Sequence, residues 1–157
     1  MTITPEVFST LINLAGRQRM LSQRIVLKTL SASLGRVDAQ AEAEQALQLF
    51  KSSHQQLVQG GRELPGLFCE PLRQAYFGSS RGDERIRAFM TQAELALRDS
   101  KRGGGQASAA VSMLEDQATP MLALLNDMTQ VYEQQAREYA AEMKRQSSQL
   151  LGQIVGI

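Results

Sequence analysis

Residues 11–25 of this chain read LINLAGRQRMLSQRI, and this stretch decides how the rest of the sequence is interpreted. Just upstream, the threonine, proline and glutamate at positions 4–6 are typical of an N-cap, a first helical residue and an acidic first turn. Apolar residues then recur at helical spacing as far as Leu34, and Gly35 is a suitable stop. We therefore expect a first helix over about residues 5–34.

On a helical wheel of about 100° per residue, an apolar stripe runs along this helix with Arg19 in its middle. The stripe consists of Phe8, Ile12, Ala15, Val26 and Leu30. A second apolar stripe holds Leu14, Leu21 and Ile25, and a polar side holds Arg17, Arg24 and Lys28. A helix with two apolar stripes has two packing partners, which we expect to be its own bundle and a second subunit.

Arg19 is a charge at a position where the pattern predicts an apolar residue. Burying a guanidinium without a counter-anion is costly, so a negative group should lie beside it. Gly16 lies one turn earlier and lets a ligand or another helix approach the backbone. If the helix pairs with its symmetry mate, two copies of Arg19 would repel each other unless they share an anion. A small, singly charged, planar oxyanion fits such a pair best.

The spacing alone leaves other interpretations open. Arg19 could instead pair with a carboxylate of another helix, for which Glu44, Glu94 and Glu115 are available, or extend its charged end into water. Gly16 could serve helix packing alone. These alternatives predict a structural role for the same residues.

The remaining helices are expected at about residues 38–59, 83–102 and 107–150, with a short helix at 72–77. Asp38 and Asp83 are the expected helix starts, residues 103–105 form a glycine linker, and Pro120 should kink the last helix or mark its beginning. The predicted fold is all-α: one domain over residues 1–157, an antiparallel four-helix bundle that dimerises through its first helix.

Composition excludes several classes of function. The 157-residue chain has 17 Lys and Arg against 16 Asp and Glu, which gives no reason to expect nucleic-acid binding. His54 and Cys69, one of each type, are too few for a metal site, and no catalytic motif is present, so we expect neither a metal nor an enzyme. We expect no membrane span and a cytoplasmic location, or an extracytoplasmic one if the chain is an excised fragment.

The segment from Asn13 to Arg24 closely resembles the signature helix of the PilJ-type sensor domain, found in nitrate/nitrite sensor kinases and some chemoreceptors. The resemblance implies a dimer through the first helix, with nitrate held on the dimer axis by one arginine from each subunit. That arginine corresponds to Arg19 and the glycine of the motif to Gly16. Four other residues of the motif are further candidates for the ligand site: Ala15, Arg17, Ser22 and Gln23.

Family members usually lie between two membrane helices and drive a kinase or methyl-accepting module, and from the sequence we expect neither in this chain. We therefore expect a sensor for nitrate or nitrite that needs no cofactor and signals to a histidine kinase, a chemoreceptor or a regulator, in a two-component or chemotaxis pathway. The alternative is a ligand-free helical adaptor that docks a kinase or chemoreceptor. It predicts a carboxylate within hydrogen-bond reach of Arg19.

Overall fold

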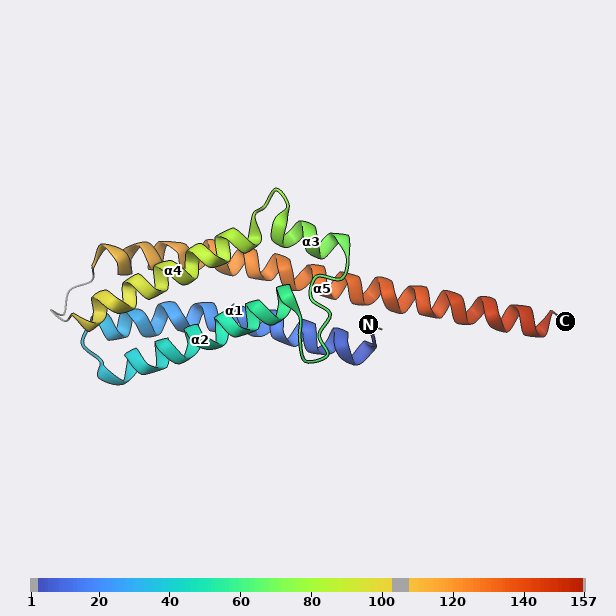
Figure 1. Cartoon of the computed structure of the whole chain (residues 1–157), viewed down its shortest axis with the longest axis horizontal. Coiled ribbons are helices and arrows are strands. Elements are labelled where there is room, and N and C mark those ends of the chain that lie inside the picture. The colour runs from blue at the N-terminus through green and yellow to red at the C-terminus, as the bar shows by residue number, and fades with distance from the viewer. Residues whose placement is uncertain (1–2, 103–107, 157) are drawn as a thin grey trace.

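The computed structural model describes residues 3–102 and 108–156, and every regular element within these ranges is a helix. The helices are α1 (Pro5–Ser33), α2 (Val37–Gln59), α3 (Glu70–Phe77), α4 (Gly82–Lys101) and α5 (Ala109–Val155). Figure 1 shows α1, α2, α4 and the N-terminal part of α5 side by side in alternating directions, with α3 against one edge. The prediction of an all-α bundle is confirmed.

Helix α1 begins and ends where its sequence signals lie. The Thr4 hydroxyl accepts the N–H of Val7 at 3.2 Å and so satisfies one of the free donors of the first turn. Gly35 follows the C-cap with a φ of 94°, and the N–H groups of Gly35 and Arg36 donate to carbonyls of the last turn. This is a Schellman motif, in which glycine is preferred because a positive φ costs it little.

Two helices begin one residue before their expected starts, and one of the two alternatives for Pro120 is excluded. Helix α2 begins at Val37, so Asp38 lies in its first turn instead of capping it. Helix α4 begins at Gly82 after Arg81, and Asp83 is likewise a first-turn residue whose carboxylate accepts from side chains of α2 and α4. Helix α5 passes through Pro120 without beginning there.

The last helix also differs in length from its expected range. It ends at Val155, five residues beyond the expected position 150, while the expected start at Ala107 and the glycine linker at 103–105 fall outside the described residues. The C-terminal part of α5 projects beyond the bundle past the start of α1 (Figure 1). Every described residue from Ala140 onward is exposed.

The core runs the length of the bundle and is built from leucine, alanine and a few aromatic side chains. Leu11 and Ile25 of α1, Phe50 of α2 and Phe89 of α4 are each at most 1% exposed, and the Phe50 and Phe89 rings lie 5.6 Å apart. Burial of this apolar surface is the main term that stabilises the helices against each other. It fixes which face of α1 points inward and which faces outward.

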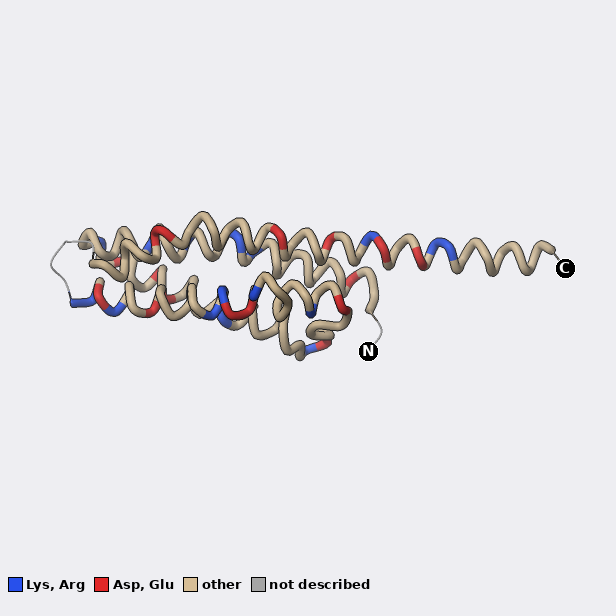
Figure 2. The backbone as a smooth tube through the Cα atoms, turned by 90° about the horizontal axis from the view of Figure 1, so that it is seen from above, with Lys and Arg blue, Asp and Glu red and all other residues tan. Residues whose placement is uncertain are grey.

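The charged residues are not sorted by sign along the bundle (Figure 2). Figure 2 shows acidic and basic residues mixed along all the helices, and none in the last turns of α5. Within the described residues, no helix combines the length and the apolar character that crossing a membrane would require.

Candidate functional site: Arg19 on the outer side of α1

Helix α1 packs against α2 on one side and against α5 on the other. Its buried residues form one broad face, which includes members of both predicted apolar stripes, such as Ala15 and Leu21, and polar residues such as Gln18. Arg19 is half-buried at the edge of this face next to α5. We expected Arg19 in the middle of a buried stripe, but it lies half-buried at the edge of the buried face, while Ala15 and Val26 of that stripe are buried.

The Arg19 side chain folds back over its own helix. Its Nε lies 3.4 Å from the carbonyl oxygen of Gly16, and its Nη1 donates to Oδ1 of Asn126, on α5, at 3.2 Å. A Cβ atom on residue 16 would lie 3.3 Å from Nη2 of Arg19. The space that Gly16 leaves open is thus occupied by the guanidinium, which the missing side chain allows to lie against α1.

No carboxylate forms an ion pair with Arg19 within residues 3–102 and 108–156. Of the three candidates, Glu44 pairs with Lys101, Glu94 pairs with Lys51, and Glu115 is exposed. A guanidinium has five N–H donors, and the two contacts described above use two of them. Arg19 is therefore a partly desolvated cation whose partners are neutral oxygen atoms.

The other predicted ligand residues spread around the helix. Ala15 is buried in the core, and the Ser22 hydroxyl donates to the carbonyl of Arg19 at 2.8 Å, inside α1. Arg17 points to α2, where its Nη2 donates to Oγ of Ser53 at 2.8 Å. Gln23 is exposed. The structure thus brings Arg19 and Gly16 together, leaves Gln23 at the surface, and turns Ala15, Ser22 and Arg17 to other surroundings.

Two exposed apolar side chains lie among the polar residues on the outward face of α1. Met20 and Leu27 are 52% and 60% exposed, seven residues apart, and Gln23 lies between them in the sequence. Residues that differ by seven positions lie on the same side of a helix. This exposed apolar strip begins one turn from Gly16, beside the Arg19 site.

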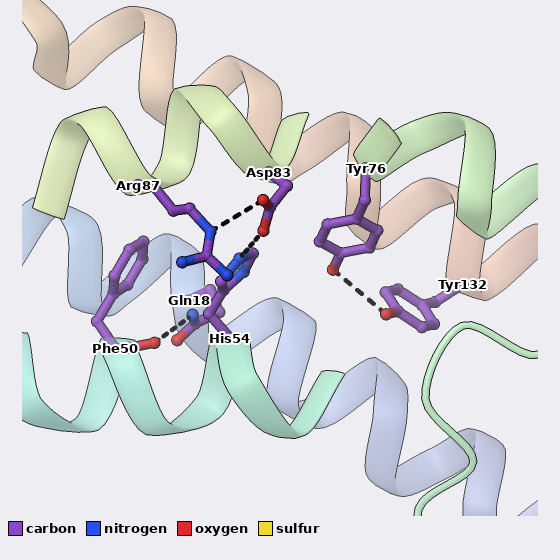
Figure 3. A network of polar contacts seen from close by, with 7 residues as sticks. All are labelled: Gln18, Phe50, His54, Tyr76, Asp83, Arg87 and Tyr132. Atoms are coloured by element: carbon purple, nitrogen blue, oxygen red, sulfur yellow. Dashed lines mark hydrogen bonds and ion pairs between the residues drawn. The ribbon is translucent and has the colours of Figure 1, made fainter. Parts of the chain in front are cut away.

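A second polar cluster lies inside the bundle (Figure 3). His54 of α2 lies with its Nε2 2.7 Å from Oδ1 of Asp83, and Nε of Arg87 donates to Oδ2 of the same carboxylate at 2.9 Å. Burial lowers the pKa of His54, and its hydrogen bond to Asp83 offsets part of this effect. His54 is thus a neutral, hydrogen-bonded core histidine at neutral pH.

The same layer contains two buried phenols and an amide (Figure 3). The hydroxyls of Tyr76 and Tyr132 lie 3.2 Å apart, and Nε2 of Gln18 donates to the carbonyl of Phe50 at 2.9 Å. Burial raises the pKa of Tyr76 to about 12 and also raises that of Tyr132, so both remain protonated at neutral pH. This layer ties α3 to α5 and α1 to α2.

Surface grooves are found elsewhere on the bundle. One of about 440 Å³ runs between α2 and α4 and includes Lys51 and Glu94, which pair with each other. Because these two charges neutralise each other, and Arg87 in the same lining pairs with Asp83, this groove lacks the uncompensated cation that distinguishes the Arg19 site. Across the described part of the chain, no three His, Cys, Asp or Glu side chains gather closely enough to hold a metal ion.

Sequence reasoning missed Asn126. Its only signal is an amide directly after the apolar run Met121–Leu125, which gives no indication that it faces a residue more than a hundred positions earlier.

The sequence matches a known family over the part of the chain that holds Arg19. No curated protein and no solved structure matches the chain. Residues 8–76 match the family model described as PilJ, Type IV pili methyl-accepting chemotaxis transducer N-term. The matched range extends from α1 to the end region of α3 and includes both Gly16 and Arg19. This description belongs to signal transduction in chemotaxis, and residues 8–76 of the chain are similar to a PilJ-type domain.

Proposed function

We propose that this chain is a non-catalytic sensor that binds nitrate, or nitrite, at a homodimer interface through Arg19. The observation that carries the proposal is the half-buried guanidinium whose hydrogen-bond partners are the carbonyl of Gly16 and the amide oxygen of Asn126. Neutral oxygens orient the side chain but leave its charge uncompensated, and a planar anion can accept two parallel N–H bonds from it.

The dimer is proposed from the surface next to this site. Met20 and Leu27 expose apolar side chains on the outward face of α1. If a second copy covers this strip about a two-fold axis, the two Arg19 side chains approach each other. One anion between them would remove their repulsion, so ligand binding and dimerisation are coupled in this proposal.

The signal is proposed to leave through α5. Asn126 connects Arg19 to this helix, and α5 continues beyond the bundle to Val155. A small shift of α5 against α1 on anion binding would be carried along a rigid helix to its projecting end. The partner there would be a histidine kinase, a chemoreceptor or a regulator, as suits the family that residues 8–76 match.

The decisive experiment is titration calorimetry with nitrate, nitrite and chloride on the wild-type protein, Arg19→Ala and Arg24→Ala. Arg24→Ala is the matched control, because Arg24 lies on the same helix but pairs with Glu42 of α2. Removing a charge-assisted, bidentate contact should weaken nitrate binding by about 100-fold in Arg19→Ala. Arg24→Ala should bind as the wild type does, and sedimentation should show nitrate shifting the wild type towards dimer.

Absence of nitrate heat in the wild type, or equal binding by Arg19→Ala, would overturn the proposal. A ligand-free adaptor would give the same melting temperature in all three anions.

A further inference from the structure

Asn126 is the one residue outside α1 that hydrogen-bonds the Arg19 side chain among the residues that the structure describes. It is half-buried on α5, and its Oδ1 accepts from Nη1 of Arg19 at 3.2 Å. Together with the Gly16 carbonyl on the Nε side, this contact fixes two edges of the guanidinium. The position of the cationic plane is thus set by one backbone atom of α1 and one side chain of α5.

The chemical type of this side chain matters more than its size. An amide oxygen accepts a hydrogen bond without carrying charge, whereas a carboxylate of the same shape would form a salt bridge and satisfy the guanidinium internally. Asp127, the next residue of α5, has such a carboxylate, but it is exposed and makes no ion pair with Arg19 among the described residues. Adjacent helical residues point about 100° apart, so the amide and the carboxylate face different directions.

We infer that Asn126 is the positioning residue that orients Arg19 while keeping its charge available to a small anion. The inference rests on the proposed function and adds a specificity determinant to the same site. It explains why α5 touches Arg19 with a neutral group where a carboxylate one position away would compete with the ligand. Through the same hydrogen bond, a movement of Arg19 on anion binding would be transmitted to α5.

Because an amide and a carboxylate are adjacent at positions 126 and 127, the two can be exchanged without changing the amino-acid composition. Asn126→Asp places a carboxylate beside Arg19, Asp127→Asn removes the neighbouring one, and the double variant Asn126→Asp/Asp127→Asn exchanges the two without changing net charge. We expect Asn126→Asp and the double variant to bind nitrate ~10- to 100-fold more weakly than the wild type, because an internal carboxylate replaces the ligand. Asp127→Asn should bind nitrate as the wild type does.

A second measurement tests whether residue 126 faces Arg19 independently of whether nitrate binds. In nitrate-free buffer, Asn126→Asp should melt at a higher temperature than the wild type, and this increase should vanish when Arg19→Ala is added. Wild-type nitrate binding that persists unchanged in Asn126→Asp would overturn the inference alone. If the wild type does not bind nitrate, but the melting-temperature increase of Asn126→Asp still depends on Arg19, the proposed function is overturned, and with it the ligand role of Asn126. A missing coupling would show that residue 126 does not face Arg19.

Discussion

Two arginines of this bundle sit in opposite electrostatic surroundings. Arg87 of α4 donates to the carboxylate of Asp83 at 2.9 Å, and the other oxygen of that carboxylate meets His54 at 2.7 Å. Arg19 of α1 contacts the carbonyl of Gly16 and the amide oxygen of Asn126. Both side chains are hydrogen-bonded, but only the first has an opposite charge beside it.

The difference separates a structural cluster from a site that can accept a ligand. In the inner layer each oxygen of Asp83 has a partner, so the cluster fixes α2 against α4 and has little to gain from an added ion. At Arg19 two neutral oxygens orient the guanidinium and leave its positive charge uncompensated. A preoriented, uncompensated cation is what an anion site requires. Changes at the inner cluster should therefore alter stability, and changes at the outer site should alter anion binding.

The largest effect is expected from Asp83→Ala. This variant leaves buried His54 without its partner and should lower the free energy of unfolding by about 2–4 kcal/mol. Arg87→Ala is the matched control, because its side chain is 63% exposed and should cost less than about 1 kcal/mol. Urea denaturation measures both values. Equal losses in the two variants would mean that the pair with Arg87, and not burial of His54, carries the energy.

The second effect concerns pH. Burial lowers the pKa of His54 from its ordinary value of 6.5, so the unfolded chain binds a proton in a pH range where the folded protein does not. The contribution of neutral His54 to the free energy of unfolding should be fully present above pH 6.5. It should be lost as pH falls from there through the lower pKa of the folded state. His54→Gln should remove this part of the pH dependence in denaturation curves. An unchanged slope in that variant would contradict the assignment.

The sequence predicted where the helices lie better than it predicted which groups surround each side chain. Caps, glycine stops and apolar spacing are local, which explains why α1 and α2 lie close to their expected ranges. The buried face of α1 was harder to predict, because Gln18 is tolerated in the core through a hydrogen bond to the carbonyl of Phe50 on another helix. Hydrophobic periodicity contains no information on such a partner.

The candidate site was predictable in part for the same reason. Arg19 and Gly16 belong to one short motif on one helix, so spacing and resemblance both indicated them. Asn126 and the His54–Asp83 pair depend on how α5 and α4 slide and rotate against their neighbours. A shift of a single residue along α5 would place Asp127 where Asn126 is, and the sequence pattern does not fix that register.

A smaller effect, with opposite signs for stability and binding, is expected from Gly16→Ala. Replacing a helix-interior glycine should stabilise the fold by up to about 1 kcal/mol. The new methyl group would lie 3.3 Å from Nη2 of Arg19 and should displace the guanidinium, so nitrate affinity should fall. Gly152→Ala is the control, because nothing lies within 4 Å of its Cβ on α5. Thermal melts and calorimetry on both variants would contradict this expectation if Gly16→Ala kept full nitrate affinity.

The smallest effect on anion binding is expected from Arg17→Ala. Arg17 is only two residues from Arg19, yet its guanidinium donates to Ser53 of α2 on another side of α1. Its removal should cost about 0.5–1.5 kcal/mol of stability, as for one hydrogen bond, and leave the calorimetric affinity for nitrate unchanged. A clear loss of nitrate binding would mean that Arg17 turns outward when the anion arrives. In that case the anion would share two arginines of each subunit, and the contrast between an outer site at Arg19 and the contacts towards α2 would no longer hold.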